Sequence, residues 1–322
     1  MRRLERVDIL MISVMLIWGM NYAIMKDAYS AFDPFAFTAL RFVVAFAVVG
    51  AILKWKGISL RVDRADIPPL LGLGLLSCTA YQIFFVIGLS TTRAGNAALL
   101  GALSPIFTFL TSLCLRHERF SRRVLGGILL SFAGVIAVVM FGSARIDFGG
   151  AIHGDAMIII SAVLWGVYPS VATRLAIKYD GMRLTFWMLL GGAASLLPIL
   201  SPFLLRQDWS SIPLLAWGEF FYSIFLSIVY SYLVWVYAIK HLGASGTAIY
   251  SNLTIIVGLG GAWLILGERP AVAQIVGIAL ILSGVFIVRS RKEVTRKTRT
   301  NTENTEKDKL SAKTPRSKGA NG

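Results

Sequence analysis

One segment of this chain occurs twice, and the second copy begins 150 positions after the first. Residues 94–138 and 244–288 each contain two apolar runs separated by an acidic-basic dipeptide, Glu118-Arg119 in one copy and Glu268-Arg269 in the other. Further residues recur at this offset: Ala94, Ala98, Leu103, Ile106, Gly127, Ile128, Leu130, Gly134, Val135 and Val138. Internal repeats of long apolar runs predict a membrane domain built from two related halves.

Composition excludes a soluble protein. Of the 322 residues, 56% are hydrophobic and only 15% are charged. Apolar runs of about 18–25 residues can cross a hydrocarbon core of about 30 Å as helices. Ten such runs predict an all-α integral membrane protein with ten transmembrane helices. They cover about residues 7–25, 34–53, 68–89, 94–115, 123–141, 155–176, 182–205, 213–239, 244–266 and 271–288.

The repeat also reaches the first helix of each half. Trp18-Gly19 in the first predicted helix matches Trp165-Gly166 in the sixth, at an offset of 147 residues. Each repeat therefore has five helices, and the predicted domains are residues 1–142 and 151–289. Because five is an odd number, the second repeat should cross the membrane in the opposite sense. We expect two inverted five-helix repeats.

The positions of Lys and Arg predict the orientation in the membrane. Before the carboxy-terminal tail, fifteen of these residues lie at helix ends and loops on the amino-terminal side, and five lie on the opposite side. Cytoplasmic loops are enriched in Lys and Arg. We therefore expect a multi-pass protein of the bacterial inner (plasma) membrane with both termini in the cytoplasm.

Much of the net charge of +15 belongs to the end of the chain. Residues 289–322 hold eleven Lys or Arg against four acidic residues. Because this segment has few apolar residues, residues 290–322 are predicted to form a basic, disordered cytoplasmic tail. Its expected partner is anionic membrane lipid, not nucleic acid. The sequence leaves the oligomeric state open.

Short motifs in the predicted helices are typical of one group of membrane proteins. They are Trp18-Gly19-Met20-Asn21-Tyr22, Leu40-Arg41-Phe42 with Ala45, Ala94-Gly95-Asn96-Ala97-Ala98 with Ser104-Pro105, and the two Glu-Arg dipeptides with the glycines that follow them. Over about residues 8–288 the chain resembles the drug/metabolite transporter superfamily and its EamA-type ten-helix carriers. The resemblance implies alternating-access transport of a small solute without ATP. It does not specify the solute, and Ile255 departs from the pattern where the first copy has Pro105.

A solute site near the middle of the membrane should be lined by aromatic or polar side chains, which are costly when they face lipid. Residues spaced three or four apart share one helix face. On this basis Ser223, Ser227, Tyr230, Val234 and Tyr237 are predicted to form one face of the eighth helix. The candidate substrate-binding residues are Trp18, Asn21, Tyr22, Arg41, Tyr81, Gln82, Trp165, Tyr168, Tyr230 and Asn252. The alternative is that their rings pack and their polar groups bond between helices.

Charged residues within the apolar runs need a separate explanation. Arg41 lies near the centre of the second helix, where an arginine costs at least about 2.5–3.5 kcal/mol. A substrate carboxylate, freed backbone carbonyls or water could compensate it. Glu219 is a candidate for carrying a coupling proton. Glu118 and Glu268 lie at helix ends, where pairing with the next arginine, capping or a gating role is expected.

No metal-ligand spacing, nucleotide-binding loop or catalytic constellation is apparent, so neither an enzyme nor a cofactor or metal site is expected. The sequence predicts a secondary transporter of small polar metabolites. Amino acids or their derivatives are the favoured substrates, and export is the favoured direction. Two alternatives remain at this stage: a membrane-embedded enzyme acting on lipid, and a non-catalytic membrane scaffold.

Overall fold

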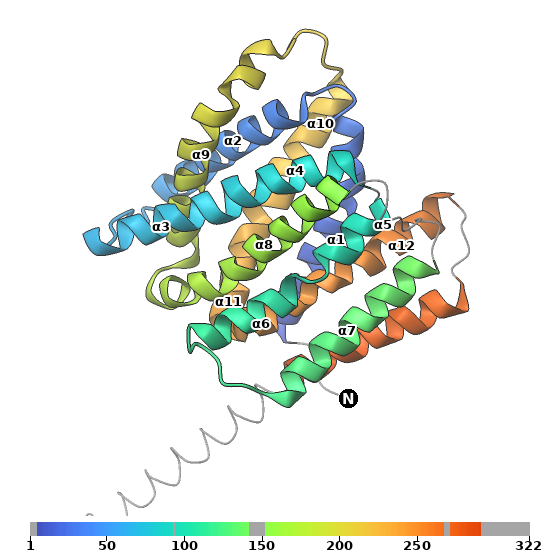
Figure 1. Ribbon diagram of the computed structural model, residues 1–322. Coiled ribbons are helices and arrows are strands. Elements are labelled where there is room, and N and C mark those ends of the chain that lie inside the picture. Colours follow the sequence, from blue (N-terminus) through green and yellow to red (C-terminus); the bar gives the residue numbers. More distant parts are fainter. Residues whose placement is uncertain (1–4, 93, 142–151, 267–270, 291–322) are drawn as a thin grey trace, which may run out of the picture.

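The computed structural model describes residues 5–92, 94–141, 152–266 and 271–290. Within these ranges, the side chains of Tyr22, Lys26, Ala94, Gly95 and residues 261–266 are not described. Figure 1 shows a bundle of long helices, with α7 (Arg122–Met140) at its lower right edge. The described part of the chain contains helices and loops and no strand.

The first repeat consists of five helical passages. α1 (Arg6–Ala28) and α2 (Pro34–Trp55) are single helices. The third passage contains η1 (Arg64–Asp66), α3 (Ile67–Gly74), the π-helical segment η2 (Leu75–Ala80) and α4 (Tyr81–Thr91). The fourth contains α5 (Ala94–Gly101) and α6 (Ser104–Cys114), and α7 is the fifth.

The second repeat follows the same plan. α8 (Ile152–Lys178) and α9 (Gly181–Arg206) are single helices. Next come α10 (Leu214–Tyr222), the π-helical segment η3 (Ser223–Tyr230), α11 (Ser231–Ala248), η4 (Ile249–Asn252) and α12 (Leu253–Leu266). The last helix is Val272–Ser290.

The helix lengths confirm ten membrane passages. Nine continuous segments in the described ranges are long and apolar enough to span a membrane, and one of them, Leu214–Gly260, has 47 residues. A helix of that length would measure about 70 Å, more than twice the thickness of the hydrocarbon core. The backbone breaks inside this segment at Gly243, which has φ 70° and ψ 175°. Glycine permits this left-handed conformation, so the segment forms the eighth and ninth passages.

Matching caps begin the second helix of each repeat. Asp33 accepts a hydrogen bond from the backbone N–H of Phe35 at 2.9 Å, and Asp180 accepts one from Met182 at 2.9 Å. These carboxylates satisfy N–H groups that have no partner within the helix. Asp33 and Asp180 are 147 positions apart, so local sequence sets the same helix start in both repeats.

Reciprocal contacts between the repeats show the inverted arrangement. The first helix of each repeat packs closely on the fourth helix of the other. A Cβ atom added to Gly19 would lie 2.6 Å from Cβ of Val257, and one added to Gly166 would lie 2.6 Å from Cβ of Phe107. Because both contacts require glycine, the repeated Trp-Gly dipeptide fixes two equivalent helix crossings.

Both repeats interrupt their fourth helix at equivalent positions. In the first repeat, α5 ends at Gly101 because Pro105 cannot donate a hydrogen bond to that carbonyl group. In the second, the 3-10 turn η4 precedes α12 although Ile255 replaces the proline. The departure at Ile255 therefore does not remove the interruption.

Candidate functional site

Four aromatic rings meet between the two repeats. Trp165 on α8 lies 5.4 Å from Trp18 on α1, 4.9 Å from Tyr81 on α4 and 5.4 Å from Trp235 on α11, measured between ring centroids. Trp18 and Trp235 are 5.1 Å apart. Trp18, Tyr81 and Trp165 are half-buried, whereas Trp235 is 1% exposed. We call these four residues the aromatic cluster.

The π-helical segment η3 helps to position this cluster. A π-helix has wider turns than an α-helix and often occurs at functional sites. The indole nitrogen of Trp18 donates a hydrogen bond to the carbonyl oxygen of Ser227 in η3, at 2.9 Å. The hydroxyl of Ser231 donates to the carbonyl of Leu226 at 2.8 Å. Side chains thus satisfy carbonyl groups within the irregular segment, and one of them orients Trp18.

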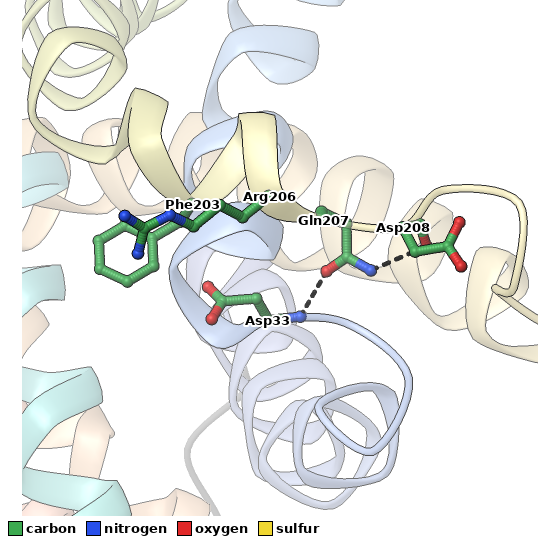
Figure 2. A pocket seen from close by; sticks show the side chains of 5 residues that line it. All are labelled: Asp33, Phe203, Arg206, Gln207 and Asp208. Atoms are coloured by element: carbon green, nitrogen blue, oxygen red, sulfur yellow. Dashed lines mark hydrogen bonds between the residues drawn. The ribbon is translucent and has the colours of Figure 1, made fainter.

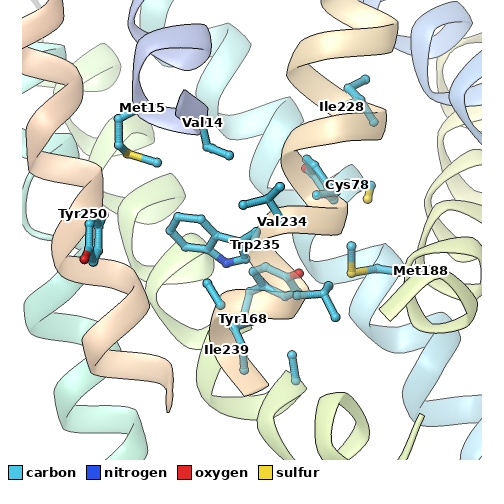
Figure 3. Packing of buried hydrophobic residues seen from close by; sticks show 14 of the residues in the cluster. Val14, Met15, Cys78, Tyr168, Met188, Ile228, Val234, Trp235, Ile239 and Tyr250 are labelled. Carbon is cyan, nitrogen blue, oxygen red and sulfur yellow. The ribbon is translucent and has the colours of Figure 1, made fainter. Parts of the chain in front are cut away.

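Tyr168 packs against the aromatic cluster through Trp165. Its ring centroid lies 5.4 Å from that of Trp165, and the side chain is 0% exposed. Figure 3 shows Tyr168 and Trp235 packed among apolar side chains such as Val234 and Ile239. The buried hydroxyl group of Tyr168 finds no hydrogen-bond partner among the residues that the structure describes. Tyr168 therefore contacts the aromatic cluster through its ring and is enclosed on all sides.

Buried Arg41 and the residues that bind it lie close to the cluster. We call Arg41, Met25, Gln82 and Ser223 the Arg41 group. Its guanidinium group donates hydrogen bonds to Gln82 Oε1 at 2.9 Å, Ser223 Oγ at 3.0 Å and Met25 Sδ at 3.1 Å. Its Cζ atom lies 5.6 Å from the ring centroid of Phe37 and 5.4 Å from that of Phe42.

The charge of Arg41 has no carboxylate opposite it among the described residues. The residue is 2% exposed, and its Nε has no hydrogen-bond partner in the described part of the chain. Burying a charge is costly unless it is paired and hydrogen-bonded. The neutral partners reduce this cost but do not cancel the charge.

Side-chain contacts connect Arg41 to the aromatic cluster by two routes. Gln82, which accepts from Arg41, adjoins Tyr81 in the chain. Phe42, which lies against Arg41, is 6.4 Å from Tyr232, and Tyr232 is 6.3 Å from Trp165. A cationic group and a set of half-buried aromatic rings therefore occupy neighbouring parts of one region.

The other predicted site residues have different surroundings. Asn21 donates to Met25 Sδ at 2.9 Å, the atom that also accepts from Arg41, so Asn21 adjoins the Arg41 group. Its buried Oδ1 has no partner within the described ranges. Tyr230 pairs with the hydroxyl of Ser13 at 2.7 Å. Asn252 donates to Ser131 Oγ at 2.9 Å and so joins η4 to α7. The side chain of Tyr22 lies outside the described part of the structure.

The three glutamates also differ in their contacts. Glu118 accepts a hydrogen bond from the backbone N–H of Ser245 at 3.1 Å. It therefore caps the start of the ninth passage, beyond Gly243, and not the helix that follows it in sequence. Glu219 is partly buried and interacts with the carboxyl group of Asp27. Glu268 lies outside the described residues.

A shallow pocket lies at the end of α9, outside the predicted site. It is lined by Asp33, Phe203, Arg206, Gln207 and Asp208 and has a volume of about 270 Å³. In Figure 2, Gln207 bridges Asp33 and Asp208 by hydrogen bonds. This pocket is open to the surroundings and joins the start of α2 to the loop after α9. None of its residues belongs to the aromatic cluster or the Arg41 group.

The structure adds residues that sequence reasoning missed and corrects one predicted face. Trp235 is a central member of the cluster, whereas Tyr237, predicted to face inward, is 36% exposed. The prediction assumed regular α-helical spacing from Ser223 to Tyr237, but the wide turns of η3 shift the face of the helix that follows. In the sequence, the only signal for Trp235 was that it is the second tryptophan in the apolar run of residues 213–239.

The fold is that of a multi-pass membrane transporter, with ten passages, reciprocal helix contacts and a buried junction between two inverted repeats. The EamA-like transporter family matches residues 6–140 and 152–290. The chain belongs to this family.

Similar proteins support the same class. An uncharacterized transporter of Archaeoglobus fulgidus is 27% identical over 89% of this chain and 99% of that protein. The uncharacterized transporter YyaM of Bacillus subtilis is 28% identical over 87% of this chain and 92% of that protein. A probable terminal-alkyne amino-acid exporter of Streptantibioticus cattleyicolor is 25% identical over 85% and 90%. A known crystal structure, 20% identical, has the same fold, with a TM-score of 0.72 over 89% of this chain and 98% of that one.

Proposed function

We propose that this protein is a secondary carrier that exports small metabolites bearing a carboxylate, with amino acids or their derivatives as the substrate class. The observation that carries the proposal is the buried guanidinium of Arg41, which has no acidic partner among the described residues. A substrate carboxylate supplies that charge and reaches the donor that the neutral partners leave free. The named amino-acid exporter among the relatives supports the same class.

The aromatic cluster gives the rest of the substrate a binding surface. Half-buried Trp18, Tyr81 and Trp165 offer ring faces to an ammonium group, an interaction that contributes roughly 0.5–2 kcal/mol. An amino acid therefore places its carboxylate toward Arg41 and its ammonium group toward the rings. Alternating access then exposes this site to one side of the membrane at a time.

The carrier has a defined orientation and a two-part organisation in this proposal. Both termini lie in the cytoplasm, and the protein lies in the bacterial inner membrane, as the distribution of Lys and Arg indicates. Residues 1–142 and 151–289 form the two functional halves, and residues 290–322 form a basic tail that lies against lipid. The protein acts without catalysis or cofactor, and Glu219 is a candidate proton carrier.

The decisive experiment compares a radiolabelled amino acid with the amide of the same amino acid in proteoliposomes. The wild-type protein is expected to prefer the free carboxylate by about 10-fold or more, since hydrogen bonds to charged groups contribute roughly 1.5–3 kcal/mol. Arg41→Gln should lose this preference at equal folded abundance. The control Arg206→Gln removes an exposed arginine at the end of α9 and should keep it.

Two results would overturn the proposed substrate class. The first is equal transport of the amino acid and its amide by the wild-type protein. The second is an Arg41→Gln variant that folds normally and still prefers the carboxylate. For direction, cells loaded with the labelled substrate should release it faster when they contain the protein, and faster uptake without faster release would contradict export.

A further inference from the structure

Two buried carboxylates outside the proposed binding site occupy equivalent positions in the repeats. Asp8 lies in the first turn of α1 and Asp155 in the first turn of α8. They are 147 positions apart, as are the two Trp-Gly dipeptides, and each is 8% exposed. A buried carboxylate must be compensated by donors, so the groups that bind each one show what it holds together.

Asp8 joins α1 to the second repeat. The hydroxyl of Tyr250, on η4 in the ninth passage, donates a hydrogen bond to Asp8 Oδ1. Arg289 at the end of the last helix donates to the same oxygen through Nε at 2.7 Å, and its Nη2 also lies 2.7 Å from that oxygen. In Figure 3, Tyr250 projects from a helix separate from the one that carries Trp235.

Asp155 joins α8 to the first repeat in the corresponding way. Asn96, on α5 in the fourth passage, donates through Nδ2 to both carboxylate oxygens, each at 3.0 Å. Thr92, between α4 and α5, donates to Oδ1. In both cases the first helix of one repeat is therefore bound to the fourth helix of the other.

The two carboxylates lie at opposite ends of the bundle. Asp8 is at the end where α1 begins and the last helix finishes, and Asp155 is at the far end because α8 begins there. In each helix the close glycine contact, at Gly19 or Gly166, comes 11 residues after the carboxylate. At 1.5 Å per residue this is about 16 Å along the axis. Each helix pair is thus joined by a tight crossing near mid-membrane and by a polar contact at one end.

This geometry has a mechanical consequence. At each crossing the facing helix lies so close that a Cβ atom added to the glycine would come within 2.6 Å of a side chain, so this point stays packed. The hydrogen bonds at the helix end, in contrast, can break and reform. When the polar contact at one end breaks, the two helices can tilt about the glycine crossing. The bundle then opens at that end. The opposite end stays closed as long as its own carboxylate remains bound.

We infer that Asp8 and Asp155 are the two latches of the transport cycle. The Asp8 contact closes the end that carries the termini, and the Asp155 contact closes the opposite end. The inference rests on the alternating access of the proposed function. It does not depend on the substrate, because neither carboxylate belongs to the aromatic cluster or the Arg41 group.

Sided labelling of a cysteine in the aromatic cluster tests the latches without any substrate. The reporter is Tyr81→Cys. It is introduced into a protein in which both native cysteines are replaced by alanine, through Cys78→Ala and Cys114→Ala. A membrane-impermeant maleimide is applied to right-side-out and to inside-out vesicles. The side of the termini is identified independently as the side from which Phe120→Cys is labelled, since exposed Phe120 follows the fourth passage.

Asp8→Asn should raise the labelling rate from the side of the termini by about 10-fold, because charge-assisted hydrogen bonds are replaced by weaker ones. Asp155→Asn should raise it by a similar factor from the opposite side. Tyr250→Phe and Thr92→Val each remove one hydroxyl donor and should give smaller shifts in the same two directions. These milder variants provide the test if either Asn variant fails to fold.

The matched control is Asp180→Asn. Asp180 also lies at the start of a helix, but its carboxylate accepts from its own helix at Met182 N, and Asn is an equally good cap. This variant should leave both labelling rates unchanged. The latch assignment is wrong if folded Asp8 and Asp155 variants label at the parent rate from both sides, or if they open the same side. Failure of the substrate proposal would instead appear in amino-acid flux and leave sided labelling intact.

Discussion

Gly134 and Gly277 lie face to face where α7 meets the last helix. A Cβ atom on Gly134 would come within 2.5 Å of the carbonyl oxygen of Gly277, and one on Gly277 within 2.7 Å of that of Gly134. Gly127 and Gly284 form the same reciprocal contact. The two helices, visible side by side in Figure 1, are the fifth of each repeat. Small residues allow such close approach of backbones in membranes.

Gly134→Ala and Gly277→Ala should therefore destabilise the protein. Each new methyl group must push apart two backbones, and overpacking of this kind costs about 1–3 kcal/mol. We expect a lower melting temperature and less folded protein in detergent, measured by fluorescence-detected size-exclusion chromatography after heating. Gly126→Ala is the control, because a Cβ at Gly126 would have no atom of the described residues facing it within 4 Å. Equal stability of the three variants would contradict the packing seen here.

The shift of the helix face after η3 gives a second prediction. Trp235 is buried in the aromatic cluster, and Tyr237, two residues later, is 36% exposed. Trp235→Leu should sharply reduce folded protein, since truncating a large buried aromatic costs about 3–5 kcal/mol. Tyr237→Leu should change it little. The measurement is folded abundance at equal expression, and a larger loss for Tyr237→Leu would support the regular spacing that the sequence suggested.

Much of this fold follows from local sequence. The lengths of the apolar runs predict the helices, and Asp33 and Asp180 mark where two of them begin. The repeat at an offset of 150 residues indicates the paired glycines. Features that depend on distant contacts were not predictable. The π-helical turn of η3 has no residue signature, and Glu118 binds Ser245, 127 positions away.

For the candidate site, too, the sequence predicted what the repeat and regular helical spacing determine, and not what depends on irregular turns. Trp18 and Trp165 were paired by the repeat, and the structure places them in contact. Trp235 was missed because η3 displaces it from the expected face. Asn252 stays a prediction, and the structure adds its hydrogen bond to Ser131 on α7. Periodicity identifies a helix face only as far as the helix stays regular.

Topology provides a third prediction. His153, at the start of α8, and Phe120, between α6 and α7, are both exposed and lie at opposite ends of the bundle. In a background where the native cysteines are replaced, His153→Cys should react with an impermeant maleimide in intact cells. Phe120→Cys should react only after the membrane is opened, because the bias of Lys and Arg places it in the cytoplasm. The reverse pattern would invert the proposed orientation.

The last prediction separates binding from packing within the aromatic residues. Trp18→Leu and Trp165→Leu alter half-buried rings that meet in a T-shaped, edge-to-face contact. Each variant should weaken the apparent affinity for an amino acid by about 2- to 30-fold, corresponding to a cation–π contribution of roughly 0.5–2 kcal/mol. Tyr168→Leu alters a fully enclosed ring and should instead lower folded abundance. Tyr22→Leu completes the set, because helical spacing places Tyr22 one turn from Trp18.

Flux is measured against substrate concentration at matched folded abundance. If the Trp18 and Trp165 variants both keep the wild-type affinity, these rings serve packing, and the substrate site must be sought around Arg41 and Gln82.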